Sequence, residues 1–374
     1  MKALQKISTL LLITISIISC NSCKKDKLSK DSLNQIECGG NETFFIKNDH
    51  SLWAAGYNFY GQLGDGTTST RETPVKIMDN VKKVSSMGGH TMILKTDNTL
   101  WACGYNINGQ LGDGASTLTV DANPIPKQIM TGVLDVSCGN AFTLILKSDG
   151  TVWACGSNLY GQFGKTTTNT DNSTPIQVNS TVKAIAAGYN HSLFLKASEE
   201  LYGAGSNIDG RLGDGTNTNQ TIPKFIINNV KTMAGCSNHT IILRNDNTVW
   251  TCGANNYGQL GDGTNTAKNT PVKIATDVIA ISKSFDNTAF LKNDNTLWNV
   301  GNNDFGQIGD GTNANTINTP KKVMNDVKLF SVGASHTVVQ NNINEVLSTG
   351  LNLQGQLGIG SISNQSSFTE ISFP

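Results

Sequence analysis

The sequence is poor in charged side chains and has no excess of either sign. Charged residues make up 15% of the 374 residues, and 28 basic groups balance 28 acidic ones, so the formal net charge at pH 7 is zero. A chain without excess positive charge offers little attraction for a polyanion, which argues against a nucleic-acid-binding protein. The low charge, against about a quarter in typical globular proteins, also argues against long amphipathic helices.

The apolar run near the N-terminus is too short to cross a bilayer as a permanent helix. Lys2 and Lys6 precede this run at residues 10–18, which ends at Ser19 and Cys20. That order is typical of an export signal, and Ile17-Ile18-Ser19-Cys20 resembles the lipobox of bacterial lipoproteins. The resemblance implies cleavage before Cys20 and a lipid on its thiol. The alternatives are an ordinary secretory signal, in which Cys20 is incidental, and lipidation at Cys23, whose flanking residues fit a lipobox badly.

The segment that follows has almost no apolar residues with which to pack. Residues 21–30 (NSCKKDKLSK) are polar and rich in lysine, a composition typical of a flexible tether. A sorting signal or a contact to lipid headgroups is the alternative. The sequence therefore predicts a lipoprotein signal peptide at 1–19, a lipidated tether at 20–32 and a folded domain at 33–374.

A glycine-rich motif recurs seven times in that domain, as in GYNFYGQLGDGT from Gly56 and GANNYGQLGDGT from Gly253. Its anchor residue stands 48, 52, 49, 48, 48 and 49 residues from the next, at Gln62, Gln110, Gln162, Arg211, Gln259, Gln307 and Gln356. A period held so closely indicates one supersecondary unit per copy.

Each copy favours four short strands and no helix. In the second copy, the segments 81–84, 91–94, 99–102 and 126–129 have the composition of strands. Asp97-Asn98 separates the second segment from the third and is typical of a tight hairpin turn, because both residues tolerate positive φ.

Four antiparallel strands bury one face well and need neighbours, and seven such units arranged radially close a ring without a long free edge. The sequence therefore predicts an all-β fold, a seven-bladed β-propeller with four short antiparallel strands per blade. Because the motif begins within a blade, we expect the two termini to meet near one blade and fasten the ring.

The repeat G-x-N-x-x-G-Q-L-G-x-G, preceded by G-x-x-H-T and L-K-x-D-N-T-L-W, resembles the RCC1 (regulator of chromosome condensation) repeat over residues 33–374. The resemblance implies the propeller fold, and together with the lipobox it implies a bacterial lipoprotein member of the family. Its implications for function are weaker, because propellers host many functions. Members of the family include a nuclear nucleotide exchange factor, a role that a lipoprotein signal makes implausible here, and a secreted bacterial inhibitor that presents its loops to an enzyme.

No catalytic, metal-binding or cofactor-binding constellation is evident in the sequence. Four histidines, His90, His191, His239 and His336, share one repeat position, where a structural role between strands is favoured over a metal ring. The recurring Asp residues of the G-D-G motif and of the hairpins are what turns require. We therefore expect no enzyme and no cofactor.

Two further sets of residues recur by register. Cys103, Cys155 and Cys252 alternate with small residues of other copies, which favours buried free thiols over disulfides. Trp53, Trp101, Trp153, Trp250 and Trp298 occupy one position of the third strand, which favours packing between blades over a sugar-binding platform.

What varies between copies is the loop before each fourth strand. The second copy carries extra residues there and places Leu118, Val120 and Ile125 in an otherwise polar segment. We expect this insertion to form a protein-binding patch, with local packing on its own blade as the alternative.

These observations predict a monomeric, lipid-anchored, extracytoplasmic propeller in the bacterial cell envelope, at the outer membrane or the cell surface. It would act as a protein-interaction scaffold and would not bind nucleic acid. The alternatives are an envelope glycan-binding protein or adhesin, which needs exposed aromatics on one face, and an enzyme, which needs a blade-unique acid or base in the central cleft.

Overall fold

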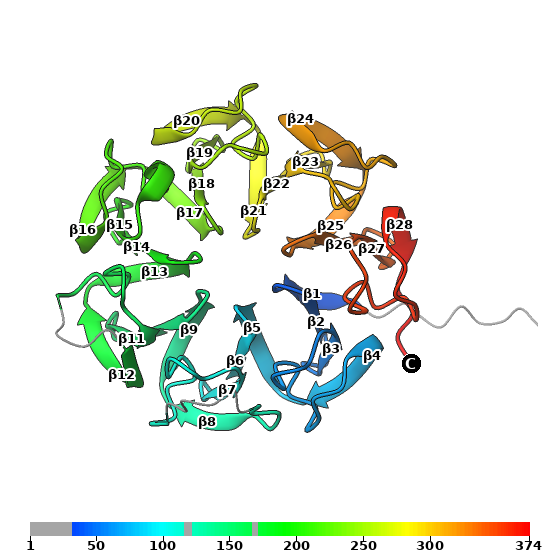
Figure 1. Cartoon of the computed structure of the whole chain (residues 1–374), viewed down its shortest axis with the longest axis horizontal. Helices are drawn as coiled ribbons and strands as arrows, with labels where there is room; N and C mark the ends of the chain where they lie inside the picture. Colours follow the sequence, from blue (N-terminus) through cyan, green and yellow to red (C-terminus); the bar gives the residue numbers. More distant parts are fainter. Residues whose placement is uncertain (1–31, 116–121, 167–170) are drawn as a thin grey trace, which may run out of the picture. The chain divides into compact units, whose positions relative to one another are not determined.

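The alternation of short apolar segments with tight turns produces seven small sheets arranged about one axis. The computed structural model describes residues 32–115, 122–166 and 171–374. These residues form seven four-stranded antiparallel sheets, each built from four strands consecutive in the chain, and the sheets stand as blades around the axis (Figure 1). The predicted seven-bladed propeller is therefore confirmed.

The strands of the first four blades have the following bounds. Blade 1 contains β1 (Leu33–Cys38), β2 (Glu42–Lys47), β3 (Leu52–Gly56) and β4 (Arg71–Met78). Blade 2 contains β5 (Val81–Met87), β6 (His90–Lys95), β7 (Leu100–Gly104) and β8 (Lys127–Met130). Blade 3 contains β9 (Val133–Cys138), β10 (Phe142–Lys147), β11 (Val152–Ser157) and β12 (Asp171–Asn179). Blade 4 contains β13 (Val182–Ala187), β14 (His191–Lys196), β15 (Leu201–Gly205) and β16 (Gln220–Ile227), with a short 3₁₀ turn, η1 (Ile208–Gly210).

The last three blades repeat this order. Blade 5 contains β17 (Val230–Gly235), β18 (His239–Arg244), β19 (Val249–Gly253) and β20 (Lys268–Ala275). Blade 6 contains β21 (Val278–Ser282), β22 (Asn287–Lys292), β23 (Leu297–Asn302) and β24 (Thr316–Met324). Blade 7 contains β25 (Val327–Val332), β26 (His336–Asn341), β27 (Val346–Gly350) and β28 (Gln365–Glu370). No helix in the described part of the chain is long and apolar enough to cross a membrane.

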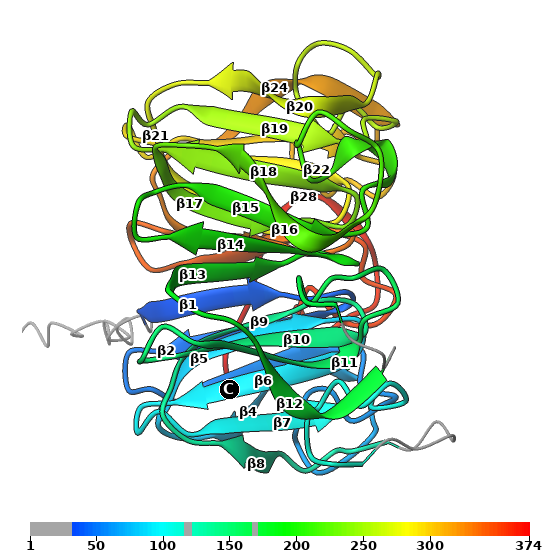
Figure 2. The same cartoon turned by 90° about the vertical axis from the view of Figure 1, so that its left-hand side faces the viewer.

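The first strand of every blade lies nearest the axis and the fourth lies outermost (Figure 1). The ring has two faces, seen at the left and right in the edge-on view of Figure 2. Because the strands are antiparallel, the first-to-second and third-to-fourth connections share one face, which we call the crossing face. The second-to-third connections share the other, which we call the hairpin face. Asn98 and Asn295 have positive φ in these hairpins, as the sequence predicts.

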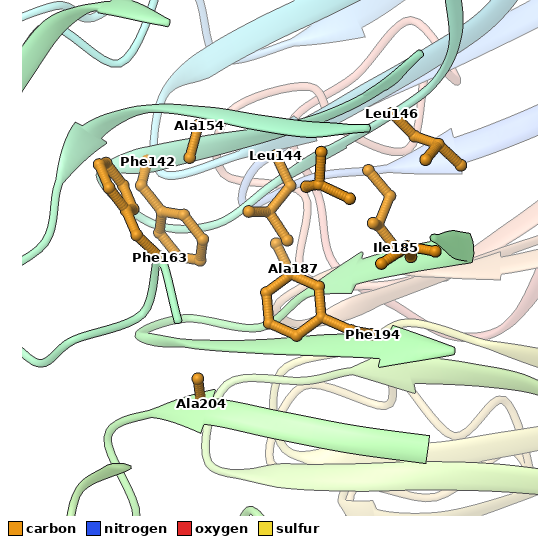
Figure 3. Packing of buried hydrophobic residues seen from close by; sticks show 11 residues of the cluster. Phe142, Leu144, Leu146, Ala154, Phe163, Ile185, Ala187, Phe194 and Ala204 are labelled. Carbon is orange, nitrogen blue, oxygen red and sulfur yellow. The ribbon is translucent and has the colours of Figure 1, made fainter. Parts of the chain in front are cut away.

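The core lies between blades. Phe142, Leu144 and Phe163 of blade 3 pack against Ile185 and Phe194 of blade 4 (Figure 3). Similar clusters fill the other junctions, so each blade buries its faces only against its neighbours. Burial of each large apolar side chain contributes about 1.5–3 kcal/mol, and the ring is therefore held by many equivalent junctions.

The two ends of the propeller meet near blade 1, as expected, but each blade keeps its own four strands. Blade 1 contains only β1–β4 and blade 7 only β25–β28. The motif begins within a blade, but a complete first strand precedes the first copy and a complete fourth strand follows the last. The seam closes through side chains instead: Phe373, beyond β28, meets Phe45 of blade 1 edge-to-face at a centroid distance of 5.1 Å.

Candidate interaction surface on the crossing face

Each glycine-rich motif forms the crossing between the third and fourth strands of its blade. In blade 1, the Oδ1 of Asn58 accepts a hydrogen bond from the Leu63 amide at 2.9 Å, and its Nδ2 donates to Asp65 at 3.0 Å. The Oε1 of Gln62 accepts from the Tyr60 amide at 3.0 Å. In the other blades, the equivalent asparagines accept the same hydrogen bond from a backbone amide: Asn106, Asn158, Asn207, Asn255, Asn303 and Asn352. The recurring Asn and Gln side chains are therefore backbone supports, as the repetition predicts.

Each crossing also lies against the next blade. Gly61 has φ of 75°, and a Cβ there would stand 2.4 Å from the Cα of Pro124 in blade 2. The Gly66 amide donates to the Pro124 carbonyl at 3.0 Å. Since glycines occupy the side of the crossing that meets the neighbour, the side chains between Asn58 and Gly61 are left on the solvent side.

Those solvent-facing side chains are mostly apolar. One large apolar residue per crossing is 37–64% exposed in six of the seven blades, and we call this set the apolar crown: Phe59, Leu159, Ile208, Tyr257, Phe305 and Leu353. Isolated exposed apolar residues need no explanation, but a set repeated on one face is typical of an interaction surface.

The crossing face is richest in aromatic rings at blades 1 and 2. Phe59 lies parallel to Tyr57 at a centroid distance of 6.4 Å and edge-to-face with Tyr60 at 5.2 Å. Tyr60 reaches Tyr105 of blade 2 at 4.7 Å. Partial burial raises the pKa values of Tyr57 and Tyr105, so both are neutral at physiological pH. We call these four residues the aromatic cluster.

The described end of the predicted protein-binding loop lies near the aromatic cluster. Ile125 is 66% exposed, and the amide of nearby Asn123 donates to the Tyr60 carbonyl at 3.1 Å. Leu118 and Val120, like the predicted lipidation site Cys20, lie outside the described residues. The structure thus joins the Ile125 end of the insertion to the aromatic cluster, a proximity that the sequence did not reveal because Tyr60 belongs to the previous blade.

The four repeated histidines are buried ties between neighbouring blades. The Nε2 atoms of His90 and His336 lie 3.0 and 2.9 Å from the hydroxyls of Thr143 and Thr43 in the next blades. His191 and His239 make the same contact with Thr240 and Thr288. Thr143 donates its own proton to the Gln110 carbonyl, so its oxygen accepts from His90. Burial lowers the pKa of His90, His239 and His336 to about 3, so the rings are neutral.

The axis carries charged residues that depart from the repeat. Lys283 of blade 6 reaches across it, with its Nζ 3.0 Å from Glu37 of blade 1 and 2.9 Å from the Ser86 carbonyl of blade 2. The Ser86 hydroxyl donates to Glu42 at 2.7 Å. We call Glu37, Glu42, Ser86 and Lys283 the axial cluster.

The charges of the axial cluster compensate one another. Burial alone would lower the pKa of Lys283, but the neighbouring carboxylates, Glu37 first, raise it above its ordinary value. Burial raises the pKa of Glu42. The amine is thus held protonated in an ion pair, which suits a tie between blades.

Alignment of the seven copies contains the signal for this cluster. Serine or alanine occupies the position of Glu37 in the other blades, and small residues occupy that of Lys283: Cys38, Ser86, Cys138, Ala187, Gly235 and Val332. The ring of Phe285, two residues after Lys283, lies edge-to-face with that of Tyr189 of blade 4, at a centroid distance of 6.4 Å. A search for residues unique to one blade therefore finds these positions.

The recurring cysteines and tryptophans lie within the propeller and between its blades. Cys38, Cys103, Cys138, Cys155, Cys236 and Cys252 are buried free thiols, as predicted. The five tryptophans pack between blades, although each remains half-exposed. Over the described ranges, no group of three His, Cys, Asp or Glu side chains is placed to hold a metal ion.

Comparisons with known proteins agree on the architecture. The family model for the RCC1-like domain matches residues 122–374, and the RCC1 repeat model matches residues 49–94 and 97–146. Human WBSCR16 is similar at 23% identity and a TM-score of 0.76, over 87% of this chain and 94% of that one. Yeast RCC1 (Prp20), solved bound to Kap60, is similar at 19% identity and a TM-score of 0.77, over 100% of this chain and 91% of that one. Prp20p from Saccharomyces cerevisiae, described with its binding to Gsp1p and histones, is 19% identical with a TM-score of 0.75, over 92% and 88% of the two chains.

Proposed function

The chain belongs to the family of RCC1-like β-propellers, and on that premise we propose that it is a lipid-anchored, extracytoplasmic scaffold that binds a protein partner through its crossing face. The observation that carries the proposal is the aromatic cluster at blades 1 and 2, which presents the exposed Phe59 near Ile125 at the described end of the variable loop. Aromatic side chains supply large contact area at low entropy cost, and they dominate protein interfaces.

The relatives support a binding role in general terms. The yeast propellers are described with the protein partners Kap60, Gsp1p and histones. Their identity to this chain is too low to transfer a partner or a contact residue. What they add is that a propeller of this kind serves as a protein-binding surface.

The tests of the binding face start from site-specific photocrosslinking in intact cells. A crosslinker at Phe59 is expected to give a discrete protein adduct, whereas one at Asn98 on the hairpin face gives none. Shortening residues 115–125 to the length of the other loops should abolish the Phe59 adduct. Equal adducts from both faces would refute the assignment of the face.

A matched pair of variants measures the contribution of the cluster. Phe59→Ser with Tyr60→Ser should weaken binding of the captured partner about 30-fold, the loss expected of a hot spot. Ile208→Ser is the control, because Ile208 is an exposed crown residue of blade 4, on another part of the ring. Equal losses from both would show that the crown, and not the cluster, binds.

The membrane anchor is tested separately through Cys20. Metabolic labelling with an alkyne fatty acid should tag the wild-type protein and the Cys23→Ala variant but not Cys20→Ala. The Cys20→Ala protein should also leave the membrane fraction. Labelling that survives Cys20→Ala would overturn the anchor and leave the propeller's binding face untouched.

Glycan binding is the second candidate function, because exposed aromatics on one face are what it requires and the aromatic cluster provides them. Binding of purified envelope glycans that is lost in the Phe59→Ser/Tyr60→Ser variant, with no protein adduct in cells, would favour it over the scaffold. The axial cluster, in contrast, is a closed ion pair, and it supports no comparable argument for an enzyme.

A further inference from the structure

The junction between blades 5 and 6 contains a cavity of about 490 Å³. Its lining comes from the end of β20 in blade 5, with Lys273, Ile274, Ala275 and Thr276, and from blade 6, with Phe290, Lys292, Trp298 and Pro320. The volume is within the range of small-molecule sites. Trp298 follows the second-to-third hairpin of blade 6, so the cavity lies toward the hairpin face, away from the aromatic cluster.

Comparison of the repeats shows why the cavity occurs there. The residue equivalent to Ala275 is a methionine in blades 1, 2 and 6 and an isoleucine in blade 4: Met78, Met130, Met324 and Ile227. In the junction of blades 1 and 2, Met78 and Trp101, the equivalent of Trp298, both pack against the same core cluster. Ala275 lacks the side chain that fills this space, and the equivalent Asn179 of blade 3 borders a smaller cavity of about 240 Å³.

Blade 5 also lacks an ion pair that blade 1 has at this position. In blade 1, Lys76 forms an ion pair with Asp79 at 2.8 Å. The equivalent residues in blade 5 are Lys273 and Thr276, and the Thr276 hydroxyl donates instead to Asp277 at 2.8 Å. Blade 5 thus has lost both the side chain that fills the groove and the carboxylate that neutralises its lysine.

Lys292, the second lysine that lines the cavity, also contributes an ammonium group. The Nζ of Lys292 stands 4.7 Å from the centroid of the Trp298 ring, as in the other blades. The nearest acid on its own hairpin, Asp294, is already engaged by the amide and hydroxyl of Thr296. Neither Lys273 nor Lys292 has an ion-pair partner within the described ranges.

We propose that this cavity is a binding site for a small carboxylate that carries a six-membered ring with an apolar face. The ring would occupy the volume that Met78 fills in blade 1, against Ile274, Phe290 and Trp298, and the carboxylate would pair with the two ammonium groups at the rim. A sugar acid and an aromatic acid share this chemistry. The site is independent of the proposed scaffold function, because it uses no residue of the crossing face.

Saturation-transfer NMR and calorimetry on the purified propeller test the site with glucuronate, benzoate and neutral glucose. Binding of glucuronate or benzoate without glucose is expected, and the better of the two identifies the source as a sugar acid or an aromatic acid. Raising the salt concentration should weaken binding, since the charges lie at the rim. A wild-type protein that binds neither acid, or binds glucose equally well, overturns the proposal.

Variants taken from the other blades locate the binding. Ala275→Met refills the cavity with the residue of blades 1, 2 and 6 and should weaken binding at least ~10-fold, and Thr276→Asp should weaken it by restoring the acid of blade 1. Asn179→Met fills the smaller cavity between blades 3 and 4 and should leave binding unchanged. Met78→Ala with Asp79→Thr should create a second site beside Trp101. Undiminished binding by Ala275→Met at a retained melting temperature would contradict the assignment.

Discussion

The blades are tied to one another in two different ways. Four junctions use a neutral histidine bonded to a threonine of the next blade, repeated at one position. Blades 6, 1 and 2 use the axial cluster, which is charged and occurs once. The histidine ties are the same in each junction, so they hold adjacent blades together without specifying which blades are adjacent. The second kind fixes which blades face each other across the axis, because the described partners of Lys283, Glu37 and Ser86, lie in blades 1 and 2.

The largest expected difference between the two kinds of tie is in their response to acid. A histidine whose pKa is 6.5 in the unfolded chain and about 3 when buried does not lower the free energy of unfolding above pH 6.5. Stability is then lost as the pH falls from 6.5 towards 3, because only the unfolded state takes up the proton. Each such histidine should cost about 2 kcal/mol at pH 5.

Urea unfolding followed at several pH values measures this loss. The raised pKa of Glu42 acts in the opposite direction, since protonation relieves a buried charge. His336→Asn copies Asn287 of blade 6. It should make the unfolding free energy depend less steeply on pH, by the contribution of one histidine. An unchanged slope would show that His336 is not protonated on unfolding in this range.

Loss of Lys283 should be the next largest effect. Lys283→Val, which copies Val332 of blade 7, leaves Glu37 without its partner and should destabilise the propeller by about 3 kcal/mol. Lys82→Val is the exposed control and should change stability by less than about 0.5 kcal/mol. Adding Glu37→Ser, the residue of blades 2, 3, 6 and 7, should recover much of the loss. A double variant no better than the single one would contradict an ion-pair role.

Removal of the C-terminal aromatic residue tests the seam. Phe373 contacts Phe45 and Trp53 edge-to-face, and Lys47 stands 4.8 Å from its ring centroid. Truncation before Phe373 should lower the free energy of unfolding by about 1–2 kcal/mol, measured by thermal denaturation. Removal of Pro374 alone is the control and should have little effect.

The smallest expected effect on stability is at the crossing face. Phe59→Ser removes an exposed side chain outside both kinds of tie, so the melting temperature should change by the equivalent of about 0.5 kcal/mol or less. The same variant is expected to lose partner binding. A large loss of stability would instead assign Phe59 a packing role.

What the sequence could predict was whatever repeats. The hairpin residues, the Asn and Gln of each crossing and the four histidines recur at fixed positions, and recurrence in a ring indicates structural support. The meeting of the two ends near one blade was predicted, but the contact between Phe373 and Phe45 was not, because it joins residues far apart in sequence. The partner of Lys283 could not be predicted, since it lies across the axis in blades 1 and 2, far away in sequence.

The candidate surface was predicted only in part. Ile125 was identified from an apolar insertion in a polar loop, but the aromatic cluster was missed, because Tyr57, Phe59 and Tyr60 stand within a motif read as structural. The motif performs both tasks: its Asn, Gln and Gly build the crossing, and the two variable positions between them face solvent. Comparison of those variable positions alone would have found the crown.

The position of β1 determines how the ring would bear a load. As the innermost strand of blade 1, β1 forms hydrogen bonds to both neighbouring blades: the Cys38 amide donates to Ser331 of blade 7, and Gln35 donates to the Val84 carbonyl of blade 2. A pull applied through the chain ahead of Leu33 would act along this strand. It would have to shear bonds in three blades at once, whereas a pull on β28 would peel an outer strand one bond at a time. A propeller attached by its N-terminal end is thus loaded where it is mechanically strongest.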